Sequence, residues 1–180
     1  MNNDETIINY FKSIDSLENA LNNVVEILQK RLIANLQTFK SEKIGLIPEG
    51  PGCYLFCAVG EKESVKEAWF KYSDQKENLP PFISSRFTKC SDLRPPQKIF
   101  PFYIGKSANL SRRIQEHFDE DDLSSTKALR LKNFLIQNSN IEIMMSYINM
   151  SLFGMTEKNY FVCSALESRL RNNLNPMIGR

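Results

Sequence analysis

The sequence predicts an α+β domain built on a small sheet. Three observations lead to this class: a helical pattern at the start of the chain, short apolar runs typical of strands, and further helical patterns among and after those runs. The 180 residues suffice for one globular domain with an appendage but are few for two complete domains. Hydrophobic residues make up 42% of the chain and charged residues 24%, which favours a soluble folded domain over a disordered chain.

Residues 1–46 are predicted to be an N-terminal helical extension. Apolar residues recur at helical spacing from residue 6 to residue 40, and neither glycine nor proline precedes Gly45. Ser13 and Asp15 offer a point at which this pattern divides into two helices. The segment IPEGPG, residues 47–52, is rich in loop-forming residues, so the main domain is predicted to span residues 47–180.

Two apolar runs predict the first strands of the main domain. They are CYLFCAV, residues 53–59, and IFPFYIG, residues 99–105. The segment between them is charged, contains several prolines and shows a helical pattern only in ESVKEAWFKY. A loop of this length inside a compact domain is either functional or disordered, and both interpretations stay open.

Four elements are predicted after this segment: a helix capped by Ser107, a helix that starts at residues 124–126, a strand over residues 141–150, and a helix from about Glu157 to Leu174. Few strands among several helices favour a small sheet covered by helices.

Composition excludes several classes of protein. No apolar run approaches the roughly 20 residues of a membrane span, and the polar N-terminus does not resemble a secretory signal, so we expect a cytoplasmic protein without a membrane partner. The net charge of +2 does not by itself indicate a nucleic-acid partner. The four cysteines form no CxxC pair and there is a single histidine, so we expect free thiols rather than a zinc site.

The segment FYIGKSANLSRRIQEHF, residues 102–118, carries the main functional signal. Gly105-Lys106-Ser107 has the form of the end of a phosphate-binding loop, but that loop needs a glycine where Phe100 stands, so no nucleotide cofactor is expected. Arg113 and His117 are four residues apart and share one helix face, with Lys106 near the positive helix terminus. This set suits a phosphodiester, although charge alone favours a solvated basic helix.

The spacing of these residues resembles a known family. Tyr103-Ile104-Gly105, followed by Arg113 ten residues after the tyrosine and His117 fourteen residues after it, is similar to the second half of the GIY-YIG nuclease motif. Gly52-Cys53-Tyr54 resembles the first half, with cysteine in the usual isoleucine position.

The resemblance extends to the C-terminal helix, where Glu167 lies nine residues before Pro176, as in the glutamate helix of the family. It covers about residues 50–180 and implies a small antiparallel sheet of about three strands flanked by helices. The sequence departs from the family in two ways. The halves of the motif lie 49 positions apart, which implies an insertion at about residues 61–98, and Gly179 replaces a common asparagine, for which Asn175 is the nearest alternative.

The resemblance implies a metal-dependent DNA endonuclease of restriction or genome-defence type. Glu167 would be the ligand of Mg²⁺ (or Mn²⁺), and Arg113 would stabilise the charge of the transition state. His117 would hydrogen-bond the nucleophile or a tyrosine hydroxyl. The alternative is a non-catalytic nucleic-acid-binding module that retains the fold.

The resemblance also implies a proton acceptor for the attacking water. Tyr54 or Tyr103 would take this role, with Lys106 and the metal lowering the tyrosine pKa, and the sequence does not choose between the two.

Substrate contacts are expected from basic residues beyond this set, most of them in the insertion: Arg112, Lys98, Lys89, Arg86 and Arg94. A disordered, solvated insertion remains an equal alternative. The expected partner is double-stranded DNA, and the N-terminal helices could contact that DNA or pair with a second copy of the chain.

Overall fold

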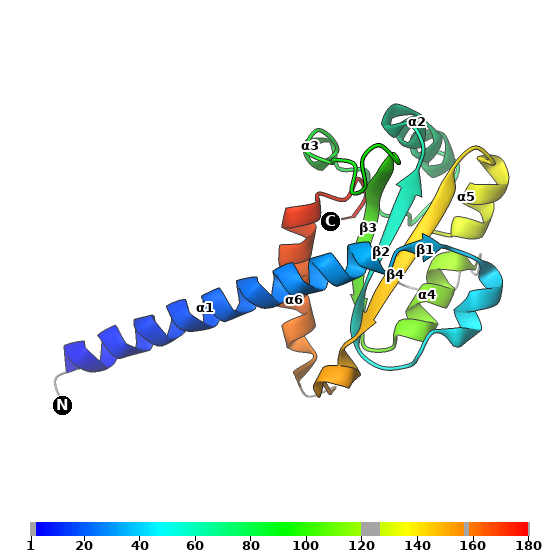
Figure 1. Ribbon diagram of the computed structural model, residues 1–180. Coiled ribbons are helices and arrows are strands. Elements are labelled where there is room, and N and C mark those ends of the chain that lie inside the picture. Colours follow the sequence, from blue (N-terminus) through cyan, green and yellow to red (C-terminus); the bar gives the residue numbers. More distant parts are fainter. Residues whose placement is uncertain (1–2, 120–126, 157–158, 180) are drawn as a thin grey trace.

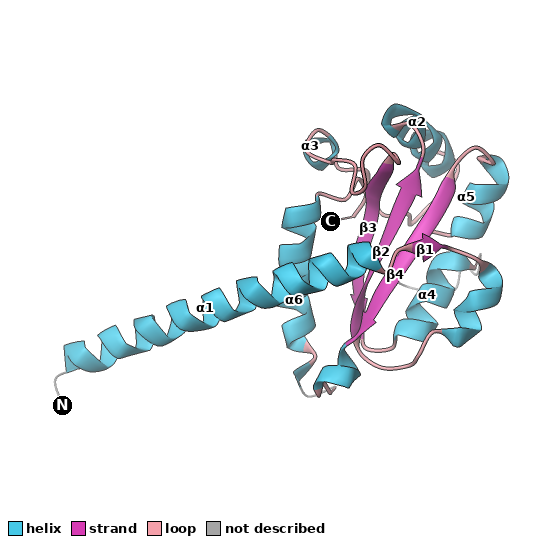
Figure 2. Cartoon of the chain, in the orientation of Figure 1, coloured by secondary structure: helices cyan, strands magenta, loops and turns pink. Residues whose placement is uncertain are grey.

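A four-stranded antiparallel sheet lies at the centre of the protein, which we analysed as a computed structural model that describes residues 3–119, 127–156 and 159–179 (Figures 1 and 2). The strand order is β1-β4-β2-β3, with β1 at Gln37–Thr38, β2 at Gly52–Val59, β3 at Ile99–Ser107 and β4 at Glu142–Asn149. The predicted α+β class is confirmed, as are the three predicted strands. The short edge strand β1 was not predicted, because two exposed residues show no strand pattern.

Helices cover both faces of the sheet (Figure 2). Their bounds are α1 Asn3–Ala34, α2 Lys62–Ser73, α3 Ser84–Phe87, α4 Leu110–Phe118, α5 Leu131–Gln137 and α6 Phe161–Leu174, with 3₁₀ turns η1 at Ser41–Leu46 and η2 at Met150–Phe153. Side chains of α1 and α6 pack on one face, and those of α2, α4 and α5 pack on the other.

Strand β2 is central and explains the apolar run that predicted it. Its alternate side chains enter the two cores: Tyr54, Phe56 and Ala58 on the face of α4, and Cys53, Leu55 and Cys57 on the face of α6. A strand buried on both faces needs apolar residues throughout, rather than an alternation of apolar and polar residues.

The N-terminal segment forms one continuous helix, so the break proposed near Ser13 and Asp15 is absent. Val25, Leu28 and Leu32 of α1 are buried in the core with α6, whereas the N-terminal half of α1 extends away from the sheet (Figure 1). The predicted boundary at residues 46 and 47 does not separate two cores, because β1 pairs with β4 and η1 packs against α4.

The segment between β2 and β3 is folded, so of the two interpretations left open the disordered one is wrong, and the helical pattern of ESVKEAWFKY is confirmed by α2. Val65, Trp69 and Tyr72 of α2 are buried, and the Trp69 ring meets those of Phe102 and Phe134 edge-on at 5.3 and 5.6 Å. Apolar residues at helical spacing give α2 a buried face, while its lysines stay at the surface.

The helix starts differ in detail from the predictions. Helix α4 is capped by Asn109, whose side-chain oxygen accepts the Arg112 N–H at 3.0 Å, whereas Ser107 ends β3. Residues 124–126, the predicted start of the next helix, and residues 157–158 lie outside the described part of the chain. None of the helices in the described ranges has both the length and the apolar content to cross a bilayer.

Candidate active site

A cavity of about 520 Å³ lies at the outer edge of β3, between α4 on one face of the sheet and α6 on the other. Farther back along the same edge, the strand is covered by the C-terminal segment, since Met177 and Ile178 donate their N–H groups to the carbonyls of Pro101 and Phe102 at 3.1 and 3.0 Å. Five of the six predicted catalytic residues line the cavity: Tyr54, Tyr103, Lys106, Arg113 and Glu167.

Tyr54 reaches this edge because its neighbour on β3 is a glycine. Tyr54 is directly opposite Gly105 in the β2–β3 ladder. A Cβ atom on residue 105 would lie 2.3 Å from the Tyr54 hydroxyl oxygen and 2.4 Å from Cζ, which no real side chain tolerates. The absence of a side chain at residue 105 therefore allows the Tyr54 ring to lie across β3 and enter the cavity.

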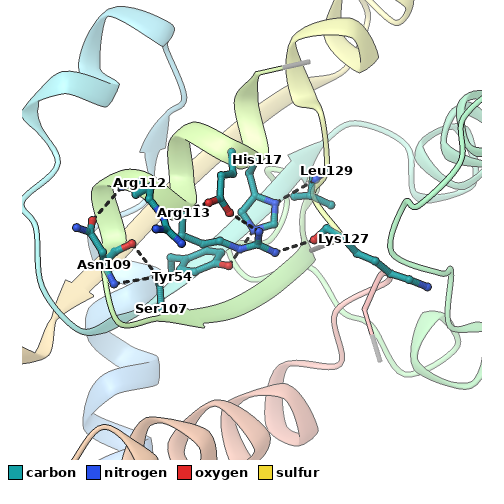
Figure 3. Close-up of polar contacts among 9 residues, drawn as sticks. Tyr54, Ser107, Asn109, Arg112, Arg113, His117, Lys127 and Leu129 are labelled. Carbon is teal, nitrogen blue, oxygen red and sulfur yellow. Dashed lines mark hydrogen bonds and ion pairs between the residues drawn. The ribbon is translucent and has the colours of Figure 1, made fainter. Parts of the chain in front are cut away.

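His117, the sixth predicted residue, is fully buried behind Tyr54 (Figure 3). The Leu129 N–H donates to His117 Nδ1 at 3.0 Å, so in the neutral ring Nε2 carries the proton. Nε2 lies 2.8 Å from the Tyr54 hydroxyl oxygen and donates to it. Burial and the nearby Arg113 charge hold the pKa of His117 well below its usual value, so the imidazole is neutral at pH 7.

Arg113 connects α4 with Tyr54 and with the segment before α5 (Figure 3). It pairs with Glu116 at 2.6 Å, donates to the Lys127 carbonyl at 2.7 Å and hydrogen-bonds the Tyr54 side chain. Burial opposes its charge, but Tyr54 and Glu116 raise the pKa of Arg113 above the ordinary value. A permanent cation is therefore fixed beside the Tyr54 oxygen.

The Tyr54 hydroxyl is protonated at neutral pH. Burial raises its pKa well above the usual value, and the negative charge that Tyr103 can acquire adds to this, while Arg113 acts in the opposite direction. The His117 Nε2–H group and the Arg113 side chain are the hydrogen-bonding groups around the oxygen. Both are donors, so both would stabilise a phenolate.

Glu167 projects from α6 into the cavity from the opposite face and is 8% exposed. Its Oε1 atom forms an ion pair with Arg171, which lies one helical turn later and lines the same cavity. Arg171 was not identified from the sequence, although the four-residue spacing from Glu167 was a signal that could have found it.

Lys106 lies between this cavity and a second one of about 870 Å³, and Arg113 also lines both. Tyr160, another residue not identified from the sequence, lines the second cavity, with its ring centre 4.9 Å from the Lys106 ammonium group. Burial and the neighbouring Cys163 and Cys53 thiols raise the pKa of Tyr160 to about 12. All four cysteines are free and buried, as expected.

The structure separates the five predicted DNA-binding residues. Arg112 lines the second cavity and its side chain is 80% exposed. The other four line neither cavity. Lys98 pairs with Glu61, and Lys89 is exposed.

The two remaining arginines have contacts within the protein. Arg94 donates to the carbonyls of Ile33 and Ala34 and so caps the end of α1. Arg86 lies close to Arg171 and to Gly179.

Gly179 lines the cavity, but a side chain at this position would be strained because its φ is +142°. Its N–H donates to the Pro81 carbonyl at 3.0 Å, and the insertion residues Asn78, Pro80 and Pro81 form the adjacent wall. Asn175 ends α6 in a left-handed conformation and does not line the cavity.

The side chains fit a divalent cation that takes few ligands from the protein. Within the described residues, Glu167 is the only carboxylate that lines the first cavity, and no three His, Cys, Asp or Glu side chains cluster as metal ligands. Mg²⁺ commonly binds through one or two carboxylates and completes its coordination with water and phosphate oxygens. The guanidinium group of Arg171 already lies beside the Glu167 carboxylate, so this position accommodates a positive charge.

The six predicted catalytic residues thus come together from β2, β3, α4 and α6. Comparison of the chain with protein-family models, with curated proteins and with solved structures finds no match in any of the three.

Proposed function

We propose that this protein is a metal-dependent DNA endonuclease of the GIY-YIG type, with a role in restriction or genome defence. The observation that carries the proposal is that Tyr54, Tyr103, Lys106, Arg113 and Glu167 line one cavity, although four separate elements supply them. Charged residues without a common role would be scattered over the surface. The position of these residues around one cavity therefore supports a shared function.

The cavity is suited to an anionic substrate. Lys106, Arg113, Lys127 and Arg171 line it, against the single carboxylate of Glu167 in the described residues. Arg113 is positioned by Glu116 and by the Lys127 carbonyl, so it needs little reorganisation to stabilise the additional negative charge of a phosphodiester transition state. Lys106 provides a second, more mobile cation at the junction of the two cavities.

Tyr54 is the group that accepts the proton of the attacking water. His117 and Arg113 hold its oxygen at the cavity and direct donors at it, and the charge of Arg113 opposes part of the rise in pKa that burial causes. Tyr103 has only partial burial and lies beside Tyr54, with the ring centres 6.3 Å apart, where it can orient the substrate. A divalent cation held by Glu167 would supply charge neutralisation at the phosphate and a lowered pKa for bound water.

A non-catalytic nucleic-acid-binding module is the second candidate, and the Glu167–Arg171 ion pair favours it. In such a module the carboxylate would serve only to neutralise Arg171. Both candidates bind DNA through the same cations, so they differ in turnover rather than in affinity.

The deciding experiment is plasmid nicking in Mg²⁺, in Mn²⁺ and in EDTA, with the wild type, Glu167→Gln and the exposed control Glu63→Gln. We expect metal-dependent nicking by the wild type and the control, and none by Glu167→Gln with an unchanged circular dichroism spectrum. Cleavage by folded Glu167→Gln would remove Glu167 from the site. DNA binding by the wild type without nicking in either metal would favour the binding module.

A further inference from the structure

Arg171 is held against the proposed metal ligand by the geometry of α6. Glu167 and Arg171 are four residues apart on this helix, and their side chains are only 10% and 20% exposed. The guanidinium contacts Oε1 of Glu167, and both residues line the 520 Å³ cavity. One carboxylate oxygen of Glu167, Oε1, therefore already has a positively charged partner within the protein.

The surroundings of Arg171 strengthen this pairing. Arg86, from α3, is close enough to Arg171 that burial and the Arg171 charge together lower the pKa of Arg86. Two guanidinium groups in proximity repel each other, and Glu167 is the only carboxylate among the described residues that line the cavity. Repulsion from Arg86 therefore adds to the reasons for Arg171 to remain paired with Glu167.

We propose that Arg171 is a tethered counter-ion that competes with a divalent cation for Glu167. The inference rests on the proposed function, in which Glu167 is the metal ligand. A guanidinium and a metal ion beside one carboxylate repel each other, so each lowers the affinity of the carboxylate for the other. Arg171 is then a positioning residue: it holds the Glu167 carboxylate at the cavity until a metal ion takes its place.

A purely structural role for the ion pair makes a different prediction. Pairs with this spacing stabilise a helix modestly, and their loss lowers stability without changing the affinity for a metal. The affinity for a metal in the absence of DNA therefore separates the two roles.

The experiment is a titration of the DNA-free protein with Mn²⁺ at pH 7.5, in which electron paramagnetic resonance measures the free ion. We expect Arg171→Met to bind Mn²⁺ about fivefold more tightly than the wild type, because the competing charge is gone. Arg171→Lys should remain close to the wild type, since it keeps a cation. Glu167→Gln should lose the site.

Arg169→Met is the matched control on the same helix. Arg169 pairs with Glu18 of α1 at 2.9 Å and does not line the cavity, so its loss should leave Mn²⁺ affinity unchanged. Folded Arg171→Met that binds Mn²⁺ no more tightly than the wild type would overturn the inference. Identical binding by the wild type and Glu167→Gln would do the same, because Glu167 would then not be the ligand.

The titration contains no DNA, so its outcome is independent of the cleavage assay. Tighter Mn²⁺ binding by Arg171→Met, together with a wild type that never nicks DNA, would support the counter-ion and remove the nuclease proposal. Metal-dependent nicking with unchanged Mn²⁺ affinity in Arg171→Met would leave the nuclease proposal intact and remove the counter-ion.

Discussion

The groups around the Tyr54 hydroxyl oxygen determine which hydrogen bonds this oxygen can form. The Tyr54 ring lies across Gly105, and its hydroxyl oxygen lies between a neutral imidazole and a permanent guanidinium. The Leu129 N–H fixes the proton of His117 on Nε2, which turns the histidine into a donor to Tyr54. His117 is therefore unsuited to take a proton from water, and its contribution is to hold Tyr54.

The pH dependence of cleavage should report the ionisation of Tyr54. Because the pKa of Tyr54 is raised well above its usual value, the reactive phenolate is a minor species that grows about tenfold per pH unit below that pKa. We expect the wild-type single-turnover rate to rise with pH between 7 and 9. Tyr54→Phe should be slow and lose this slope, whereas Tyr103→Phe should retain it. A full slope in Tyr54→Phe would exclude Tyr54 as the proton acceptor.

Helix α2 bears out the helical pattern of ESVKEAWFKY, and the structure shows what the sequence left open, namely how this helix packs. Val65, Trp69 and Tyr72 form a buried face on the same core as β3. The insertion then returns past the cavity, where Ile83 donates its N–H to the Met177 carbonyl at 2.8 Å. It is thus part of the wall of the site as well as part of the core.

Truncation of this buried face should destabilise the whole domain. Trp69 is 1% exposed and packs on Phe102 of β3, so we expect Trp69→Ala to lower the free energy of unfolding by about 3–5 kcal/mol. Phe70→Ala, at a neighbouring residue that is 42% exposed, should cost about 1 kcal/mol or less. Urea denaturation followed by circular dichroism measures both. Similar losses in the two variants would mean that the insertion does not belong to the core.

Elements with a clear pattern of apolar residues could be predicted from the sequence, and features that depend on distant contacts could not. Strands β2, β3 and β4 were predictable because their apolar runs reflect burial on one or both faces of the sheet. The spacing of Tyr103, Arg113 and His117 was recognisable because it is local in sequence, whereas Tyr54, 49 positions before Tyr103, was added through the resemblance to the family motif. The contact of Arg94 with the last carbonyls of α1 could not be predicted, because these carbonyls lie about 60 residues away in the sequence. Such contacts exist only once the chain has folded.

At the scale of the whole molecule, the site lies where the two cores meet. Helix α4 brings Arg113 from one face of the sheet, helix α6 brings Glu167 from the other, and the edge strand β3 lies between them. The geometry of the candidate site therefore depends on both packed layers, and the proposed activity should fall together with global stability.

Mild acid, between pH 6.5 and 5.5, should destabilise the folded protein through His117. His117 is the only histidine, and its folded-state pKa lies well below the usual 6.5, so at lower pH the unfolded chain binds a proton that the folded chain does not. Stability is thus fully present above pH 6.5 and lost below it, by about 1 kcal/mol between pH 6.5 and 5.5. Urea denaturation at these pH values should show this loss in the wild type and not in His117→Asn. Equal losses in both proteins would contradict this account.

The position of the only tryptophan has a practical consequence for spectroscopy. Trp69 is enclosed by phenyl rings, and one of its neighbours, Phe102, adjoins Tyr103 on β3. Its fluorescence in the native protein should therefore be emitted at short wavelength and should move to the red when α2 detaches. No label is needed to follow this, so the intrinsic fluorescence of Trp69 reports directly on the packing of α2. A dye at the cavity, which would disturb the site, is unnecessary.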